Sequence, residues 1–244
     1  MANRNAAKHP GPAPGGSRSA RATRPSARES HPAYPVMLRI AGKRCVVVGG
    51  GKVAERKVKG LLEAGADVLV VAPKATQGIQ RLAEAGAVRW KEEMFHMEHL
   101  AGALLVIAAT NDDEVNEAVA AAANTAAILA NVVDSPALCS FYVPACVRRG
   151  NLTISVSTSG ESPALSASLK RALEVAYGEE YGLFSQLLGE LRAEVQACIP
   201  LAEDRHRAWQ RAVERSDEIL ALLRSGRLHE ARELVRSCLF SHSD

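Results

Sequence analysis

The fold is decided by a nine-residue stretch, V-V-V-G-G-G-K-V-A, which runs from Val46 to Ala54. The β-branched residues before the glycines indicate a buried strand, and the apolar spacing after them indicates a helix. Within the stretch, Gly49, Gly51 and Ala54 form the pattern G-x-G-x-x-A. The glycines allow a tight turn and leave room for a pyrophosphate, while the small third residue lets helix and strand pack closely. This pattern predicts a Rossmann-type dinucleotide-binding turn.

The chain around this turn alternates between strand and helix. The expected strands are 44–48, 67–71, 87–90, 103–109 and 127–133, and the expected helices are 53–64, 76–85 and 112–123. Gly65 is expected to end the first helix, and Asn111 or Asp112 is expected to cap the third. Such alternation predicts a parallel sheet with helices on both faces.

Beyond Pro136 the pattern changes. We expect short strands at 140–143 and 152–157 and a long helix from Pro163 to about Tyr177. The rest of the chain has the spacing of helices only, at 183–197, 201–225 and 227–239. The predicted fold class is therefore α/β: a Rossmann-type parallel-sheet domain followed by a small α/β segment and a helical C-terminal domain.

Composition narrows the class of protein. The chain is 47% hydrophobic and 23% charged, as a globular protein usually is, and no long apolar run indicates a membrane span. The net charge of +3 arises in residues 1–34, which hold six basic residues and one acid, so nucleic acid is not an expected partner. Residues 1–33 are predicted to be a disordered extension, with an organelle transit peptide as the alternative. The five cysteines form no C-x-x-C pair, which suits reduced thiols and a cytoplasmic location.

Two strand ends bear on the chemistry. The acid that usually binds the ribose hydroxyls should follow the second strand, where the chain instead has Pro73 and Lys74. Lys74 suits a 2′-phosphate or is a solvated charge, so the residues alone leave NAD and NADP open. Asp134 follows the fifth strand at the edge where ligands bind, and position alone leaves open a general base or a turn residue. No histidine belongs to a metal-ligand cluster, so no metal site is predicted.

Five stretches together resemble the family of precorrin-2 dehydrogenases and sirohydrochlorin ferrochelatases, which includes the N-terminal part of siroheme synthase. They are V-V-V-G-G-G-K-V-A-E-R-K (46–57), I-A-A-T-N-D (107–112), N-V-V-D-S-P (131–136), S-F-Y-V-P-A (140–145) and S-V-S-T-S-G-E-S-P-A-L-S (155–166). They follow the family's order and spacing, and the resemblance covers about residues 35–200.

The resemblance implies an NAD-dependent oxidation of precorrin-2 to sirohydrochlorin, with Asp134 as the general base. It also implies contacts with the cofactor at the glycine turn and at two strand ends, by Gly49, Gly50, Gly51, Lys52, Val53, Pro73, Lys74, Thr110 and Asn111. Lys52 departs from the family pattern, in which many members have an acid. The family also tends to lack the ribose acid, so NAD is the predicted cofactor and NADP stays open.

Precorrin-2 is rich in carboxylates, so its site should present cations and hydroxyl groups. The expected substrate contacts are Arg148, Arg149, Ser157, Thr158 and Ser159, with exposed surface charge as the alternative for the arginines. Thr158 stands where some members have a serine that is phosphorylated, which puts such regulation in doubt here.

The resemblance further implies a homodimer that exchanges its second segment between subunits. The predicted domains are therefore an NAD-binding Rossmann domain at 34–136, a dimerisation and substrate segment at 137–180 and a helical C-terminal domain at 181–244. Whether ferrous iron is a second substrate, in a ferrochelatase reaction that gives siroheme, is left open. The alternative function is an NAD(P)-sensing binding module without catalysis.

Overall fold

A computed structural model describes residues 33–240 of the protein. The extension predicted to be disordered, 1–33, lies outside these residues except for Ala33, and so do residues 241–244. The account that follows concerns the described part of the chain.

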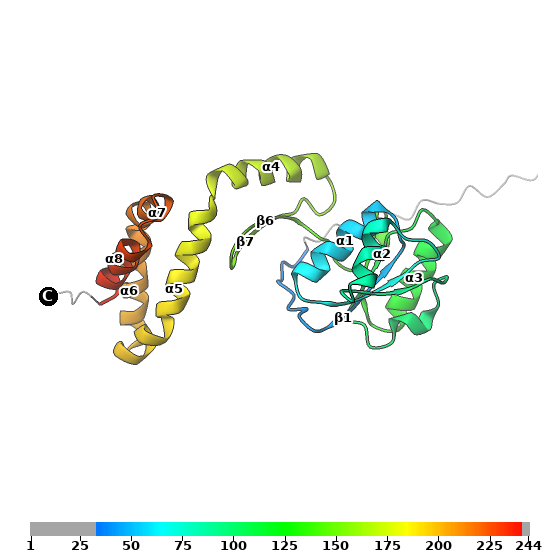
Figure 1. Cartoon of the computed structure of the whole chain (residues 1–244), viewed down its shortest axis with the longest axis horizontal. Helices are drawn as coiled ribbons and strands as arrows, with labels where there is room; N and C mark the ends of the chain where they lie inside the picture. The colour runs from blue at the N-terminus through cyan, green and yellow to red at the C-terminus, as the bar shows by residue number, and fades with distance from the viewer. Residues whose placement is uncertain (1–32, 241–244) are drawn as a thin grey trace, which may run out of the picture. The chain divides into compact units, whose positions relative to one another are not determined.

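Five parallel strands form one sheet, in the order β3-β2-β1-β4-β5. Figure 1 labels β1, the central strand of this sheet. They are β1 (Arg44–Val48), β2 (Asp67–Val71), β3 (Arg89–Lys91), β4 (Leu105–Ala108) and β5 (Leu129–Val132). The first two have the predicted bounds, whereas the other three are shorter or shifted by one or two residues. In this order the chain runs outward from β1 in both directions, so β1 and β4 flank the point at which such sheets bind dinucleotides.

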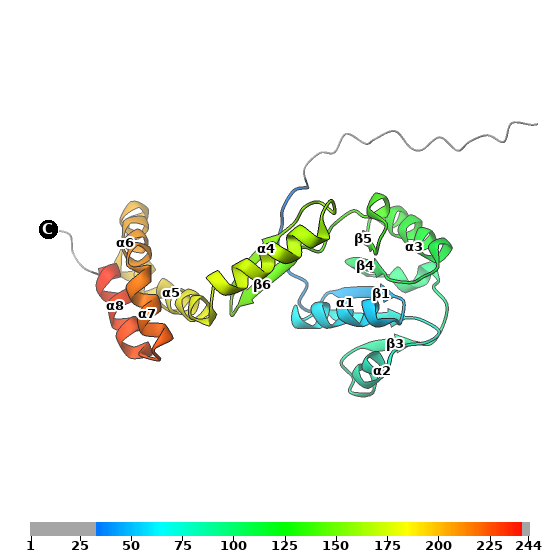
Figure 2. The same ribbon diagram turned by 90° about the horizontal axis from the view of Figure 1, so that it is seen from above.

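Helices cover both faces of the sheet, as predicted. Helices α1 (Lys52–Glu63) and α2 (Gln77–Glu84) pack on one face, and α3 (Asp113–Thr125) with the short η1 (Met97–Leu100) packs on the other (Figure 2). Alternation within β1 serves the two layers, because Cys45 and Val47 face α1 while Val46 and Val48 face α3. All four side chains are buried, so the glycine turn that follows starts from a rigid strand.

The helix ends agree with the sequence. Gly65 follows the last turn of α1 with a φ of 75°, in the left-handed conformation that favours glycine. The hydroxyl of Thr76 accepts a hydrogen bond from the backbone N–H of Ile79 and caps α2. The carboxylate of Asp112 caps α3 in the same way, by accepting from the N–H of Val115.

The prediction of a strand at 140–143 is wrong. This segment instead runs beside β5 and is held by side chains as well as backbone. The N–H of Ala130 donates to the hydroxyl of Ser140, and the amide of Asn131 donates to the carbonyl of Phe141. Pro144, which has no N–H to donate, then precedes the actual strand, β6 (Ala145–Arg149).

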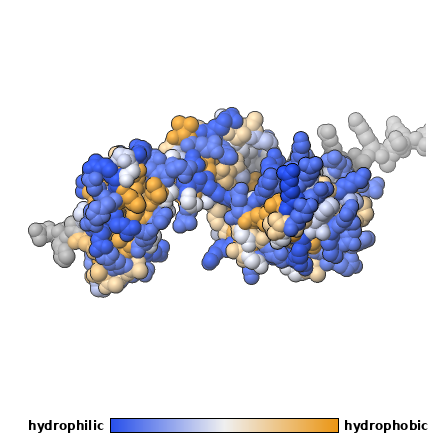
Figure 3. Space-filling model, in the orientation of Figure 1, coloured by the Kyte–Doolittle hydropathy of each residue, from blue (hydrophilic) through white to orange (hydrophobic). Residues whose placement is uncertain are grey.

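Strand β6 forms an antiparallel hairpin with β7 (Leu152–Val156). Helix α4 (Pro163–Ala176) follows, with Ser162 as its N-cap and Pro163 in its first turn, as expected. No residue of α4 is buried. Leu165, Leu169 and Val175 are among its exposed apolar side chains, and Figure 3 shows apolar surface over this helix.

The last four helices share a core of their own. They are α5 (Glu179–Cys198), α6 (Ala202–Glu214), α7 (Ser216–Arg224) and α8 (Leu228–Phe240). The single helix predicted at 201–225 is wrong, because the backbone leaves the helical conformation at Arg215, with φ −95° and ψ 20°. Ala212 and Ile219 lie on either side of the break and are two helical turns apart in the sequence. The helical spacing of apolar residues therefore continues across the break, so the sequence pattern does not reveal it. No helix among residues 33–240 is long and apolar enough to cross a membrane.

Candidate functional site

The glycine turn, Gly49–Gly51, is packed between two other strand ends. The N–H of Gly49 donates to the carbonyl of Val71, and Gly49 has a φ of 121°. A Cβ on Gly49 would lie 2.4 Å from the carbonyl oxygen of Ala109, so no larger residue fits there. A Cβ on Gly50 would lie 1.9 Å from the carbonyl oxygen of Lys74. The turn therefore contacts the end of β4 on one side and the end of β2 on the other.

Gly51 differs from the other two glycines of the turn because it faces open space. A Cβ built on it would meet nothing within 4 Å. Gly51 is also the N-cap of α1 and offers no side chain to the first N–H groups of that helix. Lys52 and Val53, the next two residues, are exposed. Free N–H groups at a helix N-terminus beside an open glycine fit the pyrophosphate of a dinucleotide.

The segment after β2 is fastened to the turn. The N–H of Thr76 donates to the carbonyl of Gly50 at 2.9 Å, and the Thr76 hydroxyl donates to Glu55 in α1 at 2.7 Å. Lys59 and Thr76 lower the pKa of the Glu55 carboxyl through hydrogen bonds to its carboxylate form. Pro73 and Lys74 are exposed beside the turn, where the ribose lies in this fold.

The other flank is the loop after β4. Thr110 bonds within this loop: its hydroxyl lies 2.9 Å from the side-chain oxygen of Asn116, and its carbonyl accepts from the Asn116 amide. Asn116 is buried, so the loop has a fixed anchor in α3. Asn111 is exposed at its tip. Thr110 and Asn111 thus lie beside the glycine turn, since the preceding residue, Ala109, contacts Gly49.

Asp134 lies just beyond β5 in an uncommon conformation. Its φ of 60° is in the left-handed region, which few residues other than glycine adopt. Its side chain is exposed and has no hydrogen bond or ion pair with any other described residue. The carboxylate is therefore available to a ligand at the carboxyl edge of the sheet.

Lys57 was not among the predicted site residues, yet it lies near Asp134. Lys57 belongs to the stripe of α1 that faces the sheet, with Ala54 and Val58, and is half-buried. Val133 packs against the same cluster. Burial lowers the pKa of the Lys57 ammonium, and Arg56 adds to the lowering, while Cys139 and Asp134 oppose it. The only indication in the sequence was that Lys57, a charged residue, has the helical spacing of the buried face of α1.

The Ser157–Ser159 segment forms a tight turn before α4. The hydroxyl of Thr158 accepts from the N–H of Ser162 and lies 3.2 Å from the hydroxyl of Ser166. Ser159 has a φ of 53°, and its N–H donates to the Ser157 hydroxyl. A Cβ on Gly160 would lie 4.0 Å from a ring carbon of Pro136, which brings this turn next to the loop that holds Asp134.

The two predicted arginines are engaged within the protein. The guanidinium of Arg149 donates to the carbonyls of Tyr177 and Glu174 at the end of α4. Arg148 pairs with Glu63 at 2.8 Å, and both side chains are exposed. Arg149 thus has a structural role in this arrangement, and the contact of either arginine with a substrate stays a prediction.

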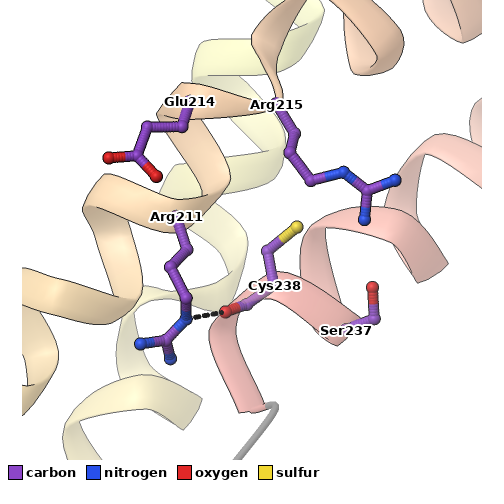
Figure 4. Close-up of a pocket in the computed structure, with 5 residues that line it drawn as sticks. All are labelled: Arg211, Glu214, Arg215, Ser237 and Cys238. Atoms are coloured by element: carbon purple, nitrogen blue, oxygen red, sulfur yellow. Dashed lines mark hydrogen bonds between the residues drawn. The ribbon is translucent and has the colours of Figure 1, made fainter. Parts of the chain in front are cut away.

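A shallow pocket in the helical part lies outside this site. Its lining residues come from α6, α8 and the break between α6 and α7, and Figure 4 shows them: Arg211, Glu214, Arg215, Ser237 and Cys238. Arg211 donates to the carbonyl of Cys238 at 2.9 Å and so ties α6 to the end of α8. The pocket contains none of the residues that the sequence predicted for a site.

The sheet order and the glycine turn define a dinucleotide-binding protein of the Rossmann class. Three family models match the chain: "Putative NAD(P)-binding" at residues 36–145, "Sirohaem biosynthesis protein central" at 149–176 and "Sirohaem synthase dimerisation region" at 180–239. The chain belongs to the precorrin-2 dehydrogenase and sirohydrochlorin ferrochelatase family, which includes the N-terminal part of siroheme synthase. This confirms the resemblance.

Individual relatives support the same family assignment. The siroheme synthase of Methylococcus capsulatus is 39% identical over 201 residues, which are 82% of this chain and 42% of the relative. That of Nitrosospira multiformis is 42% identical over 184 residues, 74% of this chain and 39% of the relative. The chain thus spans about two-fifths of these relatives. The solved structure of SirC, precorrin-2 dehydrogenase, matches with a TM-score of 0.61 and 29% identity, over 84% of this chain and 98% of that one.

Proposed function

We propose that this protein oxidises precorrin-2 to sirohydrochlorin with NAD⁺ as the oxidant, a step of siroheme biosynthesis. The observation that carries the proposal is the free carboxylate of Asp134 at the same edge of the sheet as the glycine turn. The likeness to SirC, precorrin-2 dehydrogenase, over nearly the whole of that chain supports it.

The strand order suggests how the cofactor lies. In a sheet of this order the dinucleotide crosses the edge between β1 and β4, with its pyrophosphate at the helix that follows β1. The adenosine half then points toward β2, near Pro73 and Lys74. The nicotinamide half points toward β4 and β5, near Thr110, Asn111 and Asp134.

The bound cofactor supplies the acceptor for a hydride from the macrocycle. Removing two hydrogens from precorrin-2 also releases a proton, and the Asp134 carboxylate is placed to accept it as a general base. Lys57 puts a half-buried positive charge near enough to interact electrostatically with this carboxylate. The N–H groups of Lys52 and Val53 at the start of α1 hold the pyrophosphate and so fix the distance between the two reactants.

The macrocycle would lie against the second segment of the chain. Ser157, Thr158 and Ser159 offer hydroxyl groups to its carboxylates, next to the loop that holds Asp134. Arg148 and Arg149 complete the proposed contacts, on condition that each leaves part of its present bonding.

The arrangement of domains belongs to the same proposal. We assign the cofactor to 34–136, the macrocycle and subunit exchange to 137–180 and a helical domain to 181–244, in a homodimer of the cytoplasm. The dimerisation model matches 180–239, which supports a dimer but falls on the helical region rather than on 137–180. The location of the subunit contact thus stays a prediction.

The test is anaerobic incubation with precorrin-2 and NAD⁺, followed by the absorbance of sirohydrochlorin. Asp134→Asn should lower kcat at least about 100-fold, the usual share of a general base, and leave NAD⁺ binding unchanged. Asparagine tolerates a positive φ, so the fold should persist. Asp113→Asn, in the exposed first turn of α3, is the matched control and should keep its full rate. Binding of NAD⁺ without turnover by the unaltered protein would instead favour a sensing module.

Ferrochelatase activity is a second reaction that the sequence analysis left open. Ferrous iron would be a substrate of that reaction, and sirohydrochlorin with Fe²⁺ in the presence and absence of the protein tests it. A rate equal to the uncatalysed background would exclude the activity.

A further inference from the structure

The loop after β5 is closed by one side chain, that of Cys139. The N–H of Val132, the last residue of β5, donates to the Cys139 Sγ at 3.2 Å. The thiol lies 3.2 Å from the carbonyl oxygen of Val132 and 3.5 Å from that of Ser135, and its single proton can be donated to one of them at a time. Val133 and Asp134 lie between Val132 and Ser135, so the thiol spans the part of the loop that holds the proposed base.

The place of the thiol follows from the free edge of β5. Strand β5 is the last of the sheet and has β4 on one side only. On its free side, Ala130 bonds to the hydroxyl and the backbone N–H of Ser140. Two residues further along, Cys139 bonds to Val132 with its thiol. The thiol therefore replaces a neighbouring strand at the point where the chain leaves the sheet.

The backbone holds the loop mainly from the other side. The N–H of Val133 donates to the carbonyl of Ala108 at the end of β4, at 3.0 Å. Across the loop itself, the N–H of Ser135 donates to the carbonyl of Val132 at 3.3 Å, longer than the usual bond of about 2.9 Å. Among the described residues, no side chain other than that of Cys139 bonds to the backbone of 132–135.

Asp134 does not fix its own conformation. Its φ is 60°, and its exposed side chain has no bond to another described residue. A backbone conformation of this kind persists where the surroundings determine it. Burial lowers the pKa of the Lys57 ammonium, and both Cys139 and Asp134 oppose the lowering, so the thiol and the carboxylate are within electrostatic reach of one cation. The thiol is thus near the carboxylate as well as bonded to both ends of its loop.

We infer that Cys139 is a positioning residue for the proposed dehydrogenation: its thiol holds the loop from Val132 to Ser135 and so fixes where the Asp134 carboxylate lies. The inference rests on the proposed function, in which Asp134 is the base. The thiol takes no part in the chemistry, so its effect on the rate passes through Asp134. A displacement of about 1 Å in a catalytic group can cost about 100-fold in rate.

The experiment compares variants of the full chain in the anaerobic assay with precorrin-2 and NAD⁺, after thermal unfolding has shown that each variant folds. Cys139→Ala removes every bond of the thiol, whereas Cys139→Ser keeps a donor and an acceptor at nearly the same place. Ile79→Val, on the buried face of α2, is the control because it weakens the core away from this loop.

We expect Cys139→Ala to lower kcat by about 10- to 100-fold, with the Kd for NAD⁺ changed less than about twofold. Cys139→Ser should keep kcat within about threefold of the unaltered protein, because the hydroxyl can make the same bonds. Ile79→Val should melt at a lower temperature and keep its full rate. Amide hydrogen exchange at Val132 should be at least about tenfold faster in Cys139→Ala and little changed in Cys139→Ser.

The decisive measurement is the double variant Cys139→Ala/Asp134→Asn. It should turn over within about twofold of Asp134→Asn alone, because the position of the loop no longer matters once the base is gone. A further loss as large as that in the unaltered background overturns the inference, since the thiol would then support the fold in general.

Two other results also overturn the inference and leave the proposed function standing. One is a full rate in Cys139→Ala while Asp134→Asn is impaired. The other is a Cys139→Ser variant as slow as Cys139→Ala, because the bonds of the thiol would then not be what holds the loop. A full rate in Asp134→Asn, or no turnover by the unaltered protein, overturns both proposals.

Discussion

Gly50 and Gly51 are neighbours of the same residue type, yet the structure predicts opposite consequences for changing each to alanine. In Gly50→Ala the new Cβ would lie 1.9 Å from the carbonyl oxygen of Lys74 and 2.8 Å from the Cα of Ala75. Both atoms belong to backbone, so no side chain can rotate away. An ordinary contact begins at 3.4 Å, so the segment after β2 must move by about 1.5 Å.

The cost of Gly50→Ala follows from what holds that segment. Overpacking of this kind costs about 1–3 kcal/mol. The bond from the N–H of Thr76 to the carbonyl of Gly50 contributes about 1 kcal/mol more if it is lost. The sum lowers the melting temperature by on the order of 10 °C in a chain of this length.

Gly51→Ala meets none of these obstacles. Its Cβ has no neighbour within 4 Å, and the φ of −80° suits any residue. The melting temperature should stay within about 2 °C of the unaltered protein. The added methyl group occupies the space proposed for the pyrophosphate, so NAD⁺ should bind at least about tenfold more weakly, a loss of about 1.4 kcal/mol.

The assay is thermal unfolding by circular dichroism without ligand, together with calorimetric titration of NAD⁺. The prediction is a separation of the two effects, with stability lost in Gly50→Ala and affinity lost in Gly51→Ala. Equal melting temperatures for the two variants would refute the packing argument. Unchanged NAD⁺ affinity in Gly51→Ala would refute the position assigned to the pyrophosphate.

Three further predictions concern other parts of the structure. The folded state holds the Lys57 ammonium at a lowered pKa, so Lys57→Met should raise the melting temperature and lower turnover. The unaltered protein should also gain stability as the pH rises between that lowered pKa and the ordinary pKa of lysine, because the unfolded state then binds more protons. The variant should lack this gain. Burial raises the pKa of the Cys45 thiol to about 11, and the charge of Asp67 adds to the rise. A thiol reagent at pH 8 should therefore label the exposed Cys198 in the folded protein and Cys45 only after denaturation, which peptide mapping measures. Thr76→Val removes the cap of α2 and should cost about 1–2 kcal/mol of unfolding free energy in urea, whereas Thr125→Val at the exposed end of α3 should cost less than about 0.5 kcal/mol.

The strands show where sequence reasoning works. Strands β1 and β2 were predicted with correct bounds because each is a buried β-branched run stopped soon afterwards by glycine or proline. The run at 103–109 was predicted too long, since its flanking alanines suit strand and turn equally. The segment 140–143 has the composition of a strand, but its partners are the side chain of Asn131 and the backbone of Ala130, and a local pattern does not contain that information.

The candidate site also has one part that the sequence predicts and one part that it does not. The glycine turn follows from spacing, because the steric limits on Gly49 and Gly50 act within one short motif and the strand ends that adjoin it. The place of Lys57 does not follow, because a lysine on the apolar face of a helix usually extends its ammonium to water. Its proximity to Asp134 depends on how α1 packs over the sheet, which only the tertiary structure shows.

Asp134 has a consequence for protein engineering. Its φ of 60° costs an aspartate on the order of 1 kcal/mol, a cost that glycine does not incur. Asp134→Gly should therefore melt at a higher temperature than the unaltered protein and yet lack the proposed base. A library sorted for heat resistance would enrich this change, whereas the same library sorted for turnover would reject it. Position 134 should thus reverse its rank between the two screens, and a stabilisation programme that keeps the proposed activity must leave it unchanged.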